Sequence, residues 1–153
     1  MTPFSKIYDL FLVSVKDYKI DKLYEQSVSN NTNAFEKYLE GFLIRAIPEF
    51  SNCRTPLDFD ASSSDPHFLH ELSTKEQVIL SDLMLMQWFE KEINDITQFN
   101  LHLNNTDFKH YSEAQNLKEK SDRADRIRER VYQAMVDYGY DSADWTSWFG
   151  ALV

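Results

Sequence analysis

The chain has 153 residues, the length of one domain, because a single hydrophobic core typically serves roughly 100–200 residues. It is 42% apolar and 27% charged, and its 3 Gly and 4 Pro are too few turn residues for a many-stranded sandwich or barrel, so we expect an all-α fold. The formal net charge of -9 has the wrong sign for a phosphate-binding surface, which argues against nucleic acid as a direct partner.

The single cysteine, Cys53, excludes an intrachain disulfide and a multi-cysteine zinc site, and it favours a reducing compartment. No run approaches the roughly 20 apolar residues of a membrane span. The first fifteen residues carry Asp9 within their apolar part and lack the pattern of a cleaved signal peptide. We therefore expect a soluble chain that binds no membrane.

The first predicted helix begins with Thr2 as its N-cap and Pro3 at the first helical position, where a missing N–H is tolerated. The apolar residues that follow recur at helical spacing: Phe4, Ile7, Tyr8, Phe11 and Val15. Residues 16–26 are less regular. This pattern predicts a helix with one face in the core.

A second predicted helix starts at Asn33, which has capping-box spacing to Glu36. Its end is predicted near Ile47, because Pro48 disfavours helical backbone at the residue before it. The apolar face of this helix comprises Phe35, Tyr38, Leu39, Phe42, Leu43 and Ala46.

Residues 54–72 form a predicted extended loop, because they combine Thr-Pro, Ser-Ser-Ser and Asp-Pro with little periodicity. A loop of this length is either a connector or a contact arm. His67 and His70, with Asp65 and Glu71 beside them, are the only plausible metal ligands. A four-coordinate site would need ligands from elsewhere, so we predict no metal site and no cofactor.

The segment from Val78 to Ile93 is the most apolar of the chain and follows a capping box between Ser73 and Glu76. Its apolar residues point in almost every direction around a helix, so most of its sides must be buried. It is either the centre of a bundle or a helix with a second apolar face for another subunit.

A long last helix is predicted from about Asp107 to Tyr138, with Gly139 as its left-handed C-cap. Its apolar positions form a narrow seam typical of a helix hairpin or coiled-coil contact: Leu117, Ala124, Ile127, Val131, Ala134 and Tyr138. Residues 118–130 contain six basic and four acidic side chains. Many of them are three or four residues apart, the spacing of ion pairs on a helix, such as Asp122 and Arg126. We predict that four of them lie at a subunit boundary: Asp122, Arg123, Arg126 and Arg130.

Residues 140–153 form a predicted C-terminal tail after a helical domain spanning residues 1–139. The tail contains two of the three tryptophans and no Lys or Arg. Aromatic residues are the type most enriched in binding hot spots, and three of them could hold such a segment in place. The tail either folds back on its own bundle or docks on a partner, and the predicted docking residues are Tyr140, Trp145, Trp148, Phe149 and Leu152.

Catalytic motifs are not recognisable in the sequence. The three glycines are isolated, so no phosphate-cradling loop can be assembled. Cys53 could act as a nucleophile with His102 or His110 only if the fold brought the two side chains together. We interpret Cys53 instead as a residue of the core. The carboxylates are evenly scattered. We therefore predict that the chain is not an enzyme.

The arrangement of core and cap residues resembles a family of small proteins encoded among the head and neck genes of tailed bacteriophages of Gram-positive hosts. The resemblance spans roughly the first 135 residues. It rests on the motifs Tyr8-Asp9-x-Phe11-Leu12, Leu72-Ser73-Thr74-x-Glu76-x-x-Ile79-Leu80-x-x-Leu83-Met84-x-x-x-Trp88, Ile93-Asn94 and Asp107-Phe108-Lys109-x-Tyr111-Ser112-x-Ala114-x-x-Leu117-Lys118.

The resemblance implies a virion structural protein: a helical head–tail connector, or adaptor, that forms a ring beneath a dodecameric portal or one ring further down the neck. Its partners would be the portal protein, other neck and tail proteins, and further copies of itself, with DNA passing through an acidic lumen without specific binding. It would be made in the host cytoplasm and end at the head–tail interface of the virion. In such adaptors a C-terminal extension commonly docks on the portal, and residues 140–153 are the matching segment.

Two other functions fit the composition. One is an acidic phage-encoded inhibitor that mimics DNA and occupies a host protein, although such mimics need carboxylates in rows and residues 118–130 are locally positive. The other is a plain cytosolic helical scaffold protein.

Overall fold

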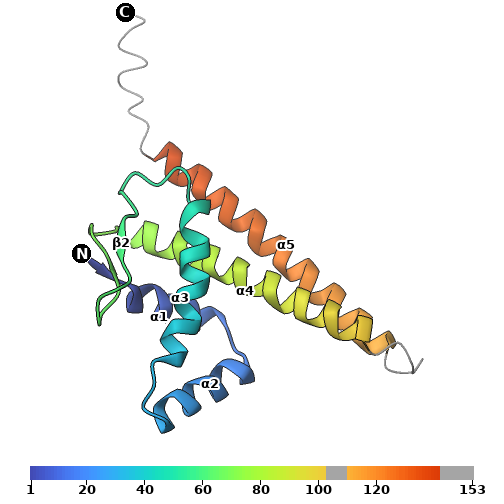
Figure 1. Cartoon of the computed structure of the whole chain (residues 1–153). Coiled ribbons are helices and arrows are strands. Elements are labelled where there is room, and N and C mark those ends of the chain that lie inside the picture. The colour runs from blue at the N-terminus through green and yellow to red at the C-terminus, as the bar shows by residue number, and fades with distance from the viewer. Residues whose placement is uncertain (103–109, 142–153) are drawn as a thin grey trace, which may run out of the picture.

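The computed structural model describes residues 1–102 and 110–141, and within them it contains five α-helices and a small sheet. The helices are α1 (Phe4–Ser14), α2 (Tyr18–Ser29), α3 (Ala34–Ala46), α4 (Thr74–His102) and α5 (His110–Tyr140), with a short 3₁₀ helix, η1 (Ile47–Glu49), after α3. Helices α4 and α5 lie side by side as a long antiparallel hairpin, and α1 and α3 cover α4 (Figure 1). The predicted all-α fold is confirmed.

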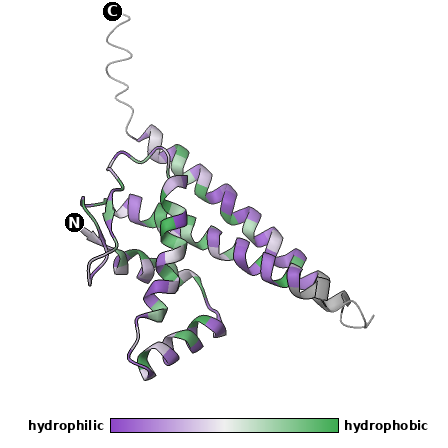
Figure 2. Cartoon of the chain, in the orientation of Figure 1, coloured by the Kyte–Doolittle hydropathy of each residue, from purple (hydrophilic) through white to green (hydrophobic). Residues whose placement is uncertain are grey.

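Helix α4 occupies the centre of the fold, packing against α1, α3 and α5. Its residues from Leu83 to Phe89 are buried without interruption, as a helix apolar on nearly every side requires. Apolar residues gather where α3 crosses α4, whereas α5 is mainly hydrophilic (Figure 2). The predicted central position of the 78–93 segment is therefore confirmed.

The seam predicted on the last helix faces α4. Ala124, Ile127, Val131 and Tyr138 are buried there, and Met135 joins them one residue after the predicted Ala134. The seam is the contact of a helix hairpin inside one chain, which was one of the two arrangements its spacing indicated.

The segment 54–72 is more ordered than the predicted loop. It contains strands β2 (Phe59–Asp60) and β3 (His67–Phe68), which pair in antiparallel fashion and add the N-terminal strand β1 (Thr2–Pro3) in the order β1-β3-β2. The rings of Phe59 and Phe68 lie 5.7 and 4.9 Å from that of Phe4. This packing fastens the segment to the start of α1.

Several helix ends differ from the predictions. Helix α1 begins at Phe4, because Thr2 is in β1 and its Oγ1 accepts a hydrogen bond from the Leu72 N–H at 2.8 Å instead of capping the helix. Asn33 makes no side-chain cap on α3. Gly139 lies inside α5 with no positive φ, so it is not a left-handed cap.

Two other end predictions are confirmed. The chain leaves α3 at Ala46 and continues through η1, which contains Pro48. Ser73 and Glu76 form the predicted reciprocal cap of α4: the Ser73 N–H donates to Glu76 Oε2 at 2.7 Å, and the Glu76 N–H donates to Ser73 Oγ at 3.3 Å.

Candidate functional site

An open groove of about 790 Å³ lies where the α1–α2 connection faces the middle of the α4–α5 hairpin. Among the described side chains its lining holds five basic and four acidic residues together with two aromatic ones. The lining residues are Ser14, Val15, Lys16, Asp17, Lys19, Trp88, Phe89, Glu92, Ile96, Asn116, Glu119, Lys120, Asp122, Arg123 and Arg126. We call this surface the hairpin groove.

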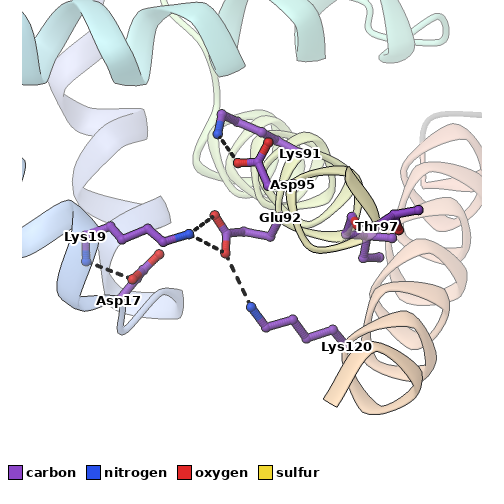
Figure 3. Close-up of polar contacts among 8 residues, drawn as sticks. Asp17, Lys19, Lys91, Glu92, Asp95, Thr97 and Lys120 are labelled. Atoms are coloured by element: carbon purple, nitrogen blue, oxygen red, sulfur yellow. Dashed lines mark hydrogen bonds and ion pairs between the residues drawn. The ribbon is translucent and has the colours of Figure 1, made fainter. Parts of the chain in front are cut away.

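A buried carboxylate ties the three walls of the hairpin groove together. Glu92 of α4 is 3% exposed, and its oxygens lie 3.3 Å from Lys19 Nζ of α2 and 3.3 Å from Lys120 Nζ of α5 (Figure 3). Asp17 caps α2 by accepting the Lys19 N–H at 2.9 Å, which fixes the start of that helix. Two carboxylates, Glu92 and Asp17, lie beside two lysines, so this part of the groove carries no net charge.

The aromatic part of the hairpin groove comes from Trp88 and Phe89, whose rings meet edge to face at 4.9 Å. The guanidinium of Arg123 lies over the Phe89 ring at 5.5 Å from its centroid, a cation–π contact. The Nε1–H of Trp88 is buried and has no hydrogen-bond acceptor in the part of the chain that the structure describes. Both rings are almost fully buried, so the guanidinium groups of Arg123 and Arg126 are the part of this wall that would contact a ligand with aromatic or acidic side chains.

Three of the four predicted subunit-boundary residues line the hairpin groove: Asp122, Arg123 and Arg126. All three are exposed, and Arg126 Nε donates to the main-chain oxygen of Asp122 at 3.3 Å instead of pairing with its carboxylate. Arg130 lies outside the groove and pairs with Asp82 of α4 at 2.9 Å. Burial raises the pKa of the Asp82 carboxyl although Arg130 lowers it. Arg130 therefore joins the two helices of one chain.

Sequence reasoning missed the other groove residues, above all Lys16, Lys19 and Glu92. The available signal was Glu92 itself, an acidic residue within the apolar segment of α4. A buried carboxylate needs partners, but the sequence alone does not identify α2 and α5 as their source.

A second cluster holds the C-terminal end of α5 against the start of α4. Tyr138 Oη donates to Glu76 Oε1 at 2.6 Å, and Tyr138 Oη in turn accepts the Arg54 N–H at 3.2 Å. Asn52 Nδ2 donates to the Met135 carbonyl at 2.7 Å. Burial by itself would raise the pKa of the Glu76 carboxyl, but hydrogen bonds, that from Tyr138 first, outweigh it and lower the pKa to about 2.

The last described residues lie beside the first turn of α4. Tyr140 is the last residue of α5 and is exposed, and the carboxylate of Asp141 pairs with Lys75 in the first turn of α4. The other predicted docking residues, Trp145, Trp148, Phe149 and Leu152, lie outside the described residues. The start of the tail is thus fixed at the N-terminal end of α4.

Cys53 is partly buried, packs against the core and contacts Glu76 Oε1 at 3.6 Å. Burial and then the charge of Glu76 raise the pKa of the Cys53 thiol to about 11, so it is a thiol and not a thiolate at neutral pH. The core-cysteine interpretation agrees with this environment. The side chains of His102 and His110, its imagined partners, lie outside the described ones.

The histidines of the 54–72 segment lie at its surface. His67 is in β3 with Nδ1 2.8 Å from the Asp65 carbonyl oxygen, and His70 is exposed. Within residues 1–102 and 110–141 no cluster of three or more His, Cys, Asp or Glu side chains is arranged to hold a metal ion.

None of the helices in the described ranges combines the length and apolar character needed to cross a membrane. Comparisons with protein-family models, with curated proteins and with solved structures find no significant match to this chain.

Proposed function

We propose that this chain is a virion structural protein, the subunit of a head–tail connector or adaptor ring that joins the portal vertex of a tailed bacteriophage to its neck and tail. The proposal begins from the resemblance over roughly the first 135 residues. The all-α fold with its long helix near the C-terminus agrees with the architecture that this resemblance implies. The proposed assembly is a homo-oligomeric ring, dodecameric like the portal, in the virion.

The observation that carries the proposal is the fixed starting point of the tail. The cluster of Tyr138 and Glu76, with the ion pair of Lys75 and Asp141, holds the end of α5 at one end of the hairpin. The segment that follows contains two tryptophans and no basic residue. An aromatic segment that starts where α5 is bonded to the end of a long hairpin suits a subunit that must reach a neighbouring protein.

The charge distribution favours a connector over a DNA mimic. On α5 the Arg128 guanidinium lies 2.8 Å from Asp125 and 3.4 Å from Glu90 of α4, so carboxylates there are neutralised within the chain. A mimic needs rows of unpaired carboxylates, whereas an acidic chain with internal pairs suits a channel wall past which DNA slides.

Truncation after Asp141 tests the proposal, because it keeps every described element. The truncated chain should retain the helical circular dichroism of the full chain but should not join portal-bearing heads to tails. The matched control is a full chain with Lys118→Glu, an exposed charge reversal on α5 outside the groove. Heads that are completed equally well by truncated and full chains would contradict a connector role for the tail.

A further inference from the structure

The hairpin groove and the tail have complementary chemistry. The groove lining carries five basic and four acidic side chains in a chain whose net charge is -9, and Lys16, Arg123 and Arg126 make no ion pair with any described residue. Residues 142–153 contain Asp144 as their only charged side chain, two tryptophans and one phenylalanine. Tryptophan is the best ring for cation–π contacts, so the basic side chains of the groove that make no ion pair suit this segment.

Further features of the groove point to an incoming apolar segment. Val13 and Tyr18, next in sequence to the lining residues Ser14 and Asp17, are 88% and 78% exposed. These exposed apolar side chains, one at each end of the α1–α2 connection, add surface that another chain can cover.

The distance from Asp141 to the groove favours the tail of another copy over the chain's own tail. Asp141 pairs with Lys75, and Phe89 lies 14 residues further along α4, or about 21 Å at 1.5 Å per residue. A fully extended chain carries Trp145 about 14 Å from Asp141 and Trp148 about 25 Å. A tail that entered the groove of its own chain would have to be almost fully extended, and it would then be too short to place both tryptophans in the groove. The tail of another copy has no such length limit.

We propose that the hairpin groove receives the tail, residues 142–153, of a second copy of this chain. The resemblance implies that this segment binds the portal. The groove provides a binding site for it on another copy of the chain. Each copy carries one tail and one groove, so the contact is head-to-tail and closes into a ring if the rotation between copies allows it. The inference shares with the proposed function only the association of copies.

Complementation between two full-length variants tests the inference. The tail variant carries Trp145→Ala and Trp148→Ala and keeps its groove. The groove variant carries Arg123→Glu and Arg126→Glu and keeps its tail. In sedimentation velocity at micromolar concentration each variant alone should self-associate at least about tenfold more weakly than the unchanged chain, the loss expected for one or two cation–π contacts. An equimolar mixture should form a dimer, because one intact tail then meets one intact groove.

The controls separate the possible outcomes. Lys118→Glu, outside the groove, should leave association unchanged, and circular dichroism checks that each variant is folded. Arg123→Gln with Arg126→Gln is the milder replacement if the reversed charges unfold the chain. Variants that associate like the unchanged chain, or a mixture that stays monomeric, would overturn the inference.

The same data keep this inference distinct from the proposed function. Mixed dimers together with failure to join heads would support the tail–groove contact and reject the connector. Rings that form equally well in the Arg123→Glu with Arg126→Glu variant would support the connector and reject the tail–groove contact. A monomeric unchanged chain whose mixture is also monomeric would place the tail on its own bundle or on another protein, and would overturn the inference.

Discussion

Replacing Tyr138 by Phe removes one hydroxyl from the cluster that holds α5 to the start of α4. That hydroxyl donates to Glu76 Oε1 at 2.6 Å and accepts the Arg54 N–H at 3.2 Å. A hydrogen bond to a charged acceptor contributes about 1.5–3 kcal/mol, and the Arg54 N–H also loses its acceptor. We expect Tyr138→Phe to lower the free energy of unfolding by about 2–3 kcal/mol at pH 7.

The loss should depend on pH in a defined direction. The pKa of Glu76 is lowered from its ordinary 4.5 to about 2, so its ionised form stabilises the fold above about pH 4.5. That contribution, on the order of 3 kcal/mol, is lost as the pH falls towards 2. Since Tyr138 supplies the largest of the hydrogen bonds that lower this pKa, the difference between the unchanged chain and Tyr138→Phe should shrink between pH 5 and pH 2.

Urea unfolding followed by circular dichroism at pH 7, 5 and 3 measures this effect. Tyr132→Phe is the matched control, because Tyr132 is an exposed tyrosine on the same helix. The double variant Glu76→Gln with Tyr138→Phe should show a coupling energy between the two sites. The reasoning is refuted if Tyr138→Phe behaves like Tyr132→Phe, or if its loss is the same at pH 7 and pH 3.

Two further predictions concern stability and reactivity. Leu83→Ala, at a fully buried position of α4, should cost about 2–5 kcal/mol in urea unfolding, whereas Val136→Ala on the exposed side of α5 should change stability by less than about 0.5 kcal/mol; similar losses at the two positions would show that α4 is not the core. Cys53 in the folded chain should react with a thiol reagent at pH 8 far more slowly than after unfolding, because burial raises the pKa of its thiol to about 11; equal rates would contradict the buried environment.

The elements with strong helical periodicity could be predicted from the sequence. The apolar run of α4, its Ser73–Glu76 cap and the seam of α5 follow from local patterns, and all three are present. Helix α2 was not predicted, because its buried residues Ile20 and Ser27 give little periodic signal. It is held by distant contacts, to α3 and through Lys19 to Glu92.

The errors at helix ends have a common physical cause. Thr2 has the chemistry of an N-cap, but strand pairing with Phe68 and the hydrogen bond from Leu72 use it elsewhere. Gly139 has the freedom of a C-cap, but the Tyr138–Glu76 contact and the Lys75–Asp141 pair carry helical structure past it. In each case a partner 62 to 70 residues away in the sequence outweighs the local preference.

The candidate site was predictable in part. Charge pairing on α5 drew attention to Asp122, Arg123 and Arg126, and these residues line the hairpin groove. The other walls come from the α1–α2 connection and from Glu92, which no spacing rule connects to α5. A groove made by three separate segments becomes visible only once the hairpin and α2 are placed together.

Electron microscopy of the purified full-length chain, alone and mixed with portal-bearing heads, tests the connector assignment most directly. We expect ring-shaped particles with rotational symmetry, and rings attached at the portal vertex of the heads. Particles no larger than single subunits in both samples would contradict it.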